Sequence, residues 1–162
     1  MKIINNPQNI NTTNYEELKQ KDEIKTRILK FLAYKKRTEQ EVRNKFKQEV
    51  NEDILEEIIE YLKEAKYIDD KEYIRKTINN FMALKNLSIR EIEYKLYSKG
   101  IKKEDIEDYI YENKEELNQY EMKSARNIAN KKITSLELEE IKQYLMKKGY
   151  KRENIAIALE DI

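Results

Sequence analysis

The side chains that could do chemistry in this 162-residue chain are mainly Asp, Glu, Lys, Ser, Thr and Tyr. The sequence contains no His, no Cys and no Trp, which excludes imidazole and thiol catalysis, zinc fingers and disulfide frameworks. Its two glycines, Gly100 and Gly149, lie far apart, whereas phosphate-binding loops need clustered glycines. We therefore expect a protein that is not an enzyme, with no catalytic residue, no metal ligand and no cofactor.

The adjacent carboxylates Asp69 and Asp70 are the strongest candidate for acid–base work or for a divalent cation. Such a pair needs a third oxygen ligand or a pocket, and the neighbouring sequence offers neither. Either aspartate can instead cap the helix that follows, while the preceding apolar side chains pack at a junction between two modules. We interpret this segment as structural, with the junction residues Tyr67, Ile68, Asp69, Asp70 and Tyr73.

Basic side chains gather at three turns of the chain and could contact phosphates or an acidic protein surface. The alternative is a solvated face, because a helix C-terminus also favours positive charge. Residues 1–50 carry 12 basic and 7 acidic side chains, whereas residues 51–112 carry 11 and 16. The candidate binding residues are Lys35, Lys36, Arg37, Arg43, Lys47, Lys99, Lys102, Lys103, Lys147, Lys148, Lys151 and Arg152.

The elements that position these residues are helices. After Pro7 no residue breaks a helix, and Glu, Lys, Leu and Ile dominate the composition. Gly100 and Gly149 each precede an apolar residue at the end of a helical pattern, which is typical of a left-handed C-terminal cap. Four segments fit the reciprocal capping box that starts a helix, namely Thr38-x-x-Glu41, Asp69-x-x-Glu72, Ser88-x-x-Glu91 and Thr134-x-x-Glu137.

The pattern of apolar residues repeats. The two glycines are 49 residues apart, and Ile92, Leu96, Ile101 and Ile106 recur at the same displacement as Ile141, Leu145, Tyr150 and Ile155. The first third of the chain matches if one residue is deleted where the glycine would stand. A unit of about 50 residues buries little surface alone, so neighbouring units should pack on one another. This periodicity predicts an all-α fold, an elongated curved array of three tandem three-helix repeats with helix-turn-helix-like units.

The predicted organisation has four parts. Residues 1–20 form a flexible N-terminal segment, followed by repeats at residues 21–68, 69–112 and 113–162. The first helix is expected to start near Lys21, and the middle helix of the last repeat at Ser135 because of the Thr134 capping box. Residues 1–20 hold no apolar run of seven or more, so we expect neither a signal peptide nor a membrane contact. We expect the protein to be cytoplasmic and a monomer.

Three segments together resemble the RecX regulatory proteins. They are Ala33-x3-Arg37-Thr38-x2-Glu41-Val42, Tyr61-Leu62-x4-Tyr67-Ile68-Asp69-Asp70-x2-Tyr73 and Ser88-x2-Glu91-Ile92-x3-Leu96-x2-Lys99-Gly100-Ile101. The resemblance implies an all-helical fold of three tandem repeats and a bacterial, non-enzymatic regulator in DNA recombination, DNA repair and the SOS response. It also implies binding in the groove of the RecA nucleoprotein filament, with inhibition of strand exchange, ATP hydrolysis and coprotease activity. Lys66 stands where the family usually has Gly.

Two other classes of function stay open at this point. One is a nonspecific single-stranded DNA-binding protein that affects recombination by competition, with single- or double-stranded DNA as its ligand. The other is a helical scaffold for an unrelated protein partner. The first predicts affinity for bare DNA that falls steeply with salt, and the second predicts no effect on RecA.

Overall fold

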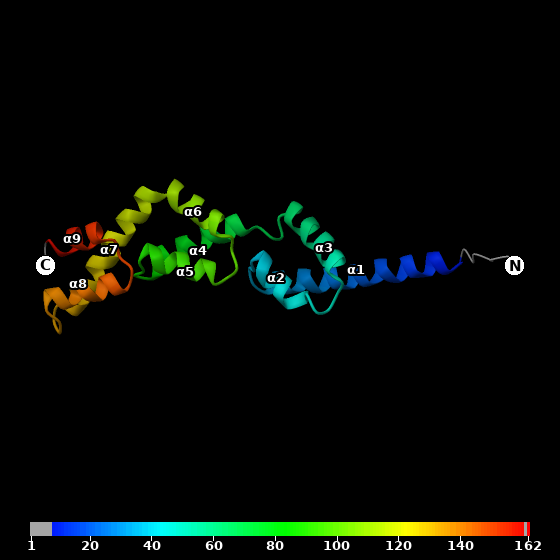
Figure 1. Cartoon of the computed structure of the whole chain (residues 1–162), viewed down its shortest axis with the longest axis horizontal. Helices are drawn as coiled ribbons and strands as arrows, with labels where there is room; N and C mark the ends of the chain where they lie inside the picture. The colour runs from blue at the N-terminus through cyan, green and yellow to red at the C-terminus, as the bar shows by residue number, and fades with distance from the viewer. Residues whose placement is uncertain (1–7, 161) are drawn as a thin grey trace. The chain divides into compact units, whose positions relative to one another are not determined.

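The computed structural model describes residues 8–160 and 162, and these residues form nine α-helices and no strand (Figure 1). The predicted all-α class is confirmed. The chain divides into two compact units, residues 1–69 and residues 70–162. The helices are α1 (Gln8–Tyr34), α2 (Glu39–Phe46) and α3 (Glu52–Glu64) in the first unit, then α4 (Asp70–Leu84), α5 (Ile89–Tyr97), α6 (Lys103–Glu112), α7 (Lys114–Lys132), α8 (Leu138–Lys147) and α9 (Arg152–Leu159) in the second.

The first unit closes around one apolar cluster that α1, α2 and α3 share. Apolar side chains three or four residues apart fall on one face of a helix, and these faces meet in the cluster. Phe31 of α1 meets Phe46 of α2 edge to face, with ring centroids 5.8 Å apart. The buried members are Ile24, Ile28, Val42, Phe46, Val50, Leu55, Ile58, Ile59, Leu62 and Ile68.

The second unit contains two apolar clusters, and α7 contributes to both. Its N-terminal half supplies Leu117 and Tyr120 to the cluster of α4, α5 and α6. Its C-terminal half supplies Ala125 and Ala129 to the cluster of α8 and α9. The small alanines allow close approach of a neighbouring helix. The described helices therefore form three groups of three, each around its own core, in the order that the repeat pattern predicts.

Two capping boxes fix the starts of the middle helices in the first two repeats. Thr38 accepts a hydrogen bond from the Glu41 amide at 3.2 Å, and the Glu41 carboxylate accepts one from the Thr38 amide at 2.9 Å. Ser88 and Glu91 make the same pair of bonds at 3.0 and 2.9 Å. Each box satisfies amides that have no partner inside the helix.

The third middle helix begins later than the Thr134 box predicts, and that prediction is wrong. The helix α8 begins at Leu138 with Glu137 as its N-cap, and the Glu137 amide donates to the Glu140 carboxylate at 2.9 Å. Thr134 instead lies in a turn in which the amides of Ser135 and Leu136 donate to the Lys132 carbonyl at 2.9 and 2.8 Å. Glu137 follows Ser88 by 49 residues, so the repeat register outweighs the local Thr134 signal.

The first helix begins earlier than predicted. The helix α1 starts at Gln8, so residues 8–20 are helical and the predicted start at Lys21 is wrong. Once a helix is nucleated, each added residue gains a hydrogen bond at modest cost, and no helix breaker follows Pro7. Residues 1–7 of the predicted flexible segment lie outside the described residues.

Three helices end on a residue with positive φ. Gly100 has φ +76° and Gly149 has φ +89°, and Lys66 has φ +62°. At Lys66 the Tyr67 amide donates to the Leu62 carbonyl at 2.8 Å and the Lys66 amide to the Lys63 carbonyl at 3.0 Å, which is the Schellman pattern. Lys66 thus adopts the left-handed backbone conformation of the two glycines, but after the third helix of its repeat, whereas Gly100 and Gly149 follow the middle helices of theirs.

Candidate functional site

In the first unit, three of the candidate basic residues are exposed lysines. Lys35 and Lys36 lie in the connection between α1 and α2, and Lys47 directly follows α2. Their positions agree with a surface that a negatively charged partner could approach.

The two arginines of the same cluster are engaged within the unit. The guanidinium of Arg43 lies 2.8 Å from Glu39 and 2.6 Å from Glu56, so it joins α2 to α3. The hydrogen bond with Glu56 raises the pKa of Arg43 above its ordinary value. The Arg37 guanidinium lies 4.5 Å from the centre of the Phe31 ring. The positive charge of Arg43 is thus neutralised by two carboxylates, and Arg37 is stacked on an aromatic ring.

In the second unit, the candidate residues lie at the same turn of two successive repeats, between the middle and third helices. Lys99, Lys102 and Lys103 surround the α5–α6 turn, and Lys147, Lys148, Lys151 and Arg152 surround the α8–α9 turn. All seven side chains are exposed. Among them, Lys103 lies 3.3 Å from Glu107, Lys148 lies 3.3 Å from Glu91, and Lys151 donates to Asn118 at 2.8 Å.

The junction residues divide between the two units. Ile68 is buried in the core of the first unit, and Tyr73 packs against the first core of the second. Asp69 lies 3.8 Å from Lys66, and Asp70 is the first residue of α4. Tyr67 remains 52% exposed, whereas Ile68 is buried.

The sequence analysis missed a buried carboxylate, Glu121 on α7, which is fully buried. It accepts hydrogen bonds from the amide of Ile89 at 2.9 Å, from the amide of Lys151 at 3.3 Å and from the side chain of Asn154. These donors lie at the N-termini of α5 and α9, where amides have no partner within the helix and favour a negative charge. Glu121 therefore ties the second repeat to the third. The sequence places Glu121 four residues after the core residue Leu117, which indicates that Glu121 lies on the buried face of the helix.

Two buried tyrosines, Tyr120 and Tyr150, lie at the same contact between the second and third repeats. Tyr120 donates to the Lys85 carbonyl at 2.7 Å and accepts from the Leu87 amide at 3.0 Å. The hydroxyl of Tyr150 lies 2.7 Å from that of Ser124. Burial raises the pKa of both phenols, because the ionised form loses its hydration. The phenols thus act as neutral hydrogen-bonding groups that hold loops and helices onto α7.

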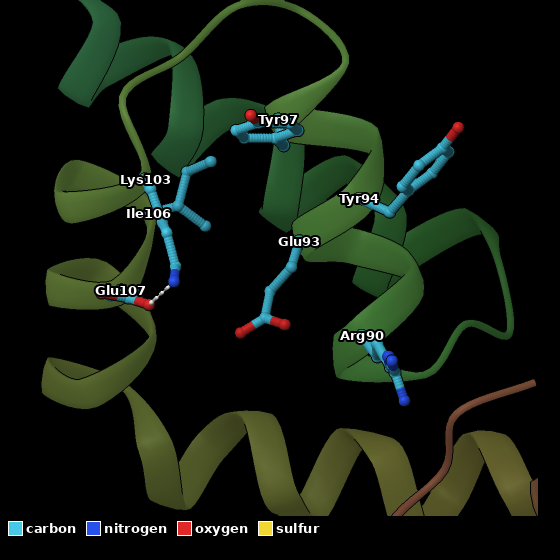
Figure 2. Close-up of a pocket in the computed structure, with 7 residues that line it drawn as sticks. All are labelled: Arg90, Glu93, Tyr94, Tyr97, Lys103, Ile106 and Glu107. Carbon is cyan, nitrogen blue, oxygen red and sulfur yellow. Dashed lines mark ion pairs between the residues drawn. The ribbon is translucent and has the colours of Figure 1, made fainter.

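The exposed surface of the second unit carries two grooves between a middle and a third helix. The α5–α6 groove, of about 330 Å³, is shown in Figure 2, where the side chain of Glu93 points into the space between the two helices. The α8–α9 groove has about 440 Å³. The first is lined by Arg90, Glu93, Tyr94, Tyr97, Lys103, Ile106 and Glu107, and the second by Lys142, Gln143, Met146, Arg152, Ile155 and Ala156.

Comparison with known proteins assigns the chain to a family. It is 35% identical over 133 residues to the regulatory protein RecX of Finegoldia magna, a match that covers 75% of this chain. It is 30% identical over 138 residues to the regulatory protein RecX of Staphylococcus carnosus, covering 83% of this chain. The chain belongs to the RecX family. No protein-family model matches it.

The fold of this RecX family member also has a solved counterpart. The crystal structure of RecX from Lactobacillus salivarius superposes with a TM-score of 0.78 over 89% of this chain and 97% of that chain, at 23% identity. The chain spans 63% of the length of the F. magna protein and 52% of that of the S. carnosus protein. Among its described residues, no helix is both long enough and apolar enough to serve as a membrane span.

Proposed function

We propose that this RecX family member is a non-enzymatic, cytoplasmic regulator that binds as a monomer in the groove of the RecA nucleoprotein filament. There it inhibits the recombinase, ATPase and coprotease activities, in DNA recombination, DNA repair and the SOS response. The observation that carries the proposal is the exposed basic turn that recurs between the middle and third helices of two successive repeats. Its residues are Lys99, Lys102 and Lys103, then Lys147, Lys148, Lys151 and Arg152.

The proposed mechanism depends on repetition. Repeats at residues 21–68, 69–112 and 113–162 would offer similar surfaces in succession to a polymer whose subunits also repeat. Several weak contacts on one chain act together, because after the first contact the others form at a high effective concentration. A protein held in this way would occupy the space of a second DNA strand. It would also disturb the interfaces between subunits at which ATP is hydrolysed.

The experiment that tests the proposal is a titration of this protein into RecA hydrolysing ATP on single-stranded DNA. We expect the ATPase rate to fall to a plateau as the protein is added. In parallel, binding to the bare oligonucleotide is measured as a function of salt. A protein that only binds DNA would show comparable affinity without RecA and a steep salt dependence. A scaffold for an unrelated partner would leave the ATPase rate unchanged at every concentration. Either result would contradict the proposal.

A further inference from the structure

The α5–α6 groove and the α8–α9 groove are the same structural feature built twice. Each of the six residues that line the α8–α9 groove follows a residue of the α5–α6 groove by 49 positions. The pairs are Glu93 and Lys142, Tyr94 and Gln143, Tyr97 and Met146, Lys103 and Arg152, Ile106 and Ile155, and Glu107 and Ala156. The backbone geometry of the repeat therefore sets the groove, while the side chains around it differ.

Both grooves combine an apolar floor with an open rim. Ile106 and Ile155 form the floors and are 3% and 2% exposed. In the α5–α6 groove, Tyr94 and Tyr97 stand at the rim and are 72% and 62% exposed. Exposed tyrosines supply large contact areas at low entropic cost and are enriched where proteins bind one another.

The two grooves differ in sign of charge at one equivalent position, Glu93 and Lys142, whereas Lys103 and Arg152 are basic in both and Arg90 also lines the α5–α6 groove. Glu93 and Glu107 line the α5–α6 groove, in which Lys103 lies 3.3 Å from Glu107 and Glu93 points into the open space (Figure 2). The α8–α9 groove has Lys142 where the other has Glu93, and Ala156 where the other has Glu107. Its charged lining residues, Lys142 and Arg152, are both basic.

The first repeat carries an ion pair at the equivalent positions. Following the register of the core residues, Arg43 corresponds to Glu93 and Glu56 corresponds to Glu107. The Arg43 and Glu56 side chains meet at 2.6 Å and so span the space between α2 and α3. The later repeats carry Glu with Glu and Lys with Ala, which cannot form this bridge. The repeat thus places the two helices, and the side chains at these positions decide whether an ion pair spans the space between them.

This charge pattern indicates which class of macromolecule can bind in the two grooves. A nucleic acid presents phosphates everywhere, and in the α5–α6 groove these would meet the carboxylate of Glu93, while Lys103 is already paired with Glu107. A basic side chain fits there, because its cation can approach Glu93 while its stem lies on the tyrosine rings. An acidic side chain fits the α8–α9 groove beside Lys142 and Arg152. A polypeptide can present different charges to the two grooves, whereas a nucleic acid presents phosphates to both.

We propose that the two grooves are paired docking sites for one protein partner. The α5–α6 groove receives a basic side chain of that partner, and the α8–α9 groove receives an acidic one. The inference rests on the proposed function, in which the partner is the RecA filament. It places the specific contacts in the grooves beside the basic turns.

The test exchanges the two charges. Three variants of the full chain, Glu93→Lys, Lys142→Glu and the double exchange, are titrated against RecA filaments on single-stranded DNA and against the bare oligonucleotide. Each single variant should bind the filament about tenfold more weakly, because like charges are brought together. The double exchange keeps the net charge of the natural chain and should bind at least as weakly as either single variant.

Matched controls separate groove contacts from bulk charge. Glu115→Lys and Lys131→Glu make the same charge changes at exposed positions of α7 and should leave filament affinity within about twofold. Glu93→Lys should also tighten binding to the bare oligonucleotide, the opposite of its effect on the filament. Helix content and melting temperature verify the folding of every variant.

The outcomes distinguish the two proposals. If the natural chain binds filaments and the double exchange binds equally well, only net charge matters, and the groove inference is overturned while the proposed function stands. The groove inference is also overturned if Glu93→Lys binds the filament as tightly as the natural chain or more tightly. If the natural chain does not bind filaments at all, the proposed function fails and the partner assigned to the grooves fails with it.

Discussion

At the scale of single residues, Lys66 shows how the fold imposes a conformation that its side chain disfavours. Its φ of +62° is the left-handed conformation, which costs a residue with a Cβ about 1 kcal/mol relative to glycine. The Schellman bonds at Tyr67 and Lys66 keep it there, because they close the end of α3 and lead Ile68 into the core.

We therefore expect Lys66→Gly to raise the free energy of unfolding of the first unit by about 0.5–1 kcal/mol. Chemical denaturation monitored by circular dichroism measures the change. The control is Lys66→Ala, which removes the ammonium group near Asp69 but keeps the Cβ, and it should be close to neutral. Equal stabilisation by both substitutions would show that the side chain, and not the backbone conformation, is the source.

Glu121 is a buried polar link between the second and third repeats. Its carboxylate serves donors from two helix N-termini and the Asn154 side chain. Glu121→Leu leaves these buried donors without an acceptor and should lower the free energy of unfolding by about 3 kcal/mol or more. Glu121→Gln keeps one oxygen and should cost less.

Hydrogen exchange gives the specific readout for Glu121. The amides of Ile89 and Lys151 should exchange faster in Glu121→Gln than in the natural chain, while amides of the first unit should not change. The exposed Glu116 lies on the same helix, and Glu116→Gln provides the control. Unchanged exchange at both amides would contradict the role assigned to Glu121.

At the scale of elements, ion pairs between helices make the stability of the first unit depend on pH. Burial opposes the ionisation of Glu39, but hydrogen bonds from Arg43 and Lys63 outweigh it, and the pKa of Glu39 is lowered. The hydrogen bond from Arg43 also lowers the pKa of Glu56. A carboxylate with a lowered pKa in the folded state stabilises that state above the ordinary pKa, and the stabilisation is lost as the pH falls through the lowered value.

The melting temperature of the first unit should therefore fall as the pH decreases from about 5 to about 3. Arg43→Met keeps much of the side-chain volume but removes the charge that α2 and α3 share. This variant should melt lower at neutral pH and lose less stability on acidification. Thermal melts of both proteins across this range provide the measurement, and parallel pH curves would contradict the assignment.

At the scale of the whole molecule, the structure changes which basic residues should be tested for function. Arg43 is compensated by Glu39 and Glu56, and Arg37 is stacked on Phe31. Reversing their charge would disrupt the first unit itself. Lys35, Lys36 and Lys47 are exposed and can be reversed with little effect on folding.

Reversal of these three lysines to Glu should weaken inhibition of the RecA ATPase by about tenfold or more, since each contact with an acidic surface becomes a repulsion. The matched control reverses Lys19, Lys71 and Lys123, which are also exposed and lie outside the candidate set. Inhibition curves at two salt concentrations provide the measurement. Equal losses in both triple variants would show that net charge, and not this cluster, determines inhibition.

The sequence by itself determined the local features of this protein. Helix type, the Thr38 and Ser88 caps and the apolar register depend on residues within about two helical turns of one another, so they can be read along the chain. The register also determined the cap of α8 at Glu137, although the local signal at Thr134 pointed elsewhere. The resemblance to RecX depended on the same short segments.

Only the tertiary structure decided which polar side chains meet across helices. The bonds from Ile89 and Asn154 to Glu121 join residues 32 and 33 positions apart, and the Arg43–Glu56 pair spans 13. A sequence pattern gives the face on which such a residue lies but not the atoms opposite it, because those come from another helix. The same reason explains the two grooves, whose equivalent positions became visible only when the middle and third helices were placed together.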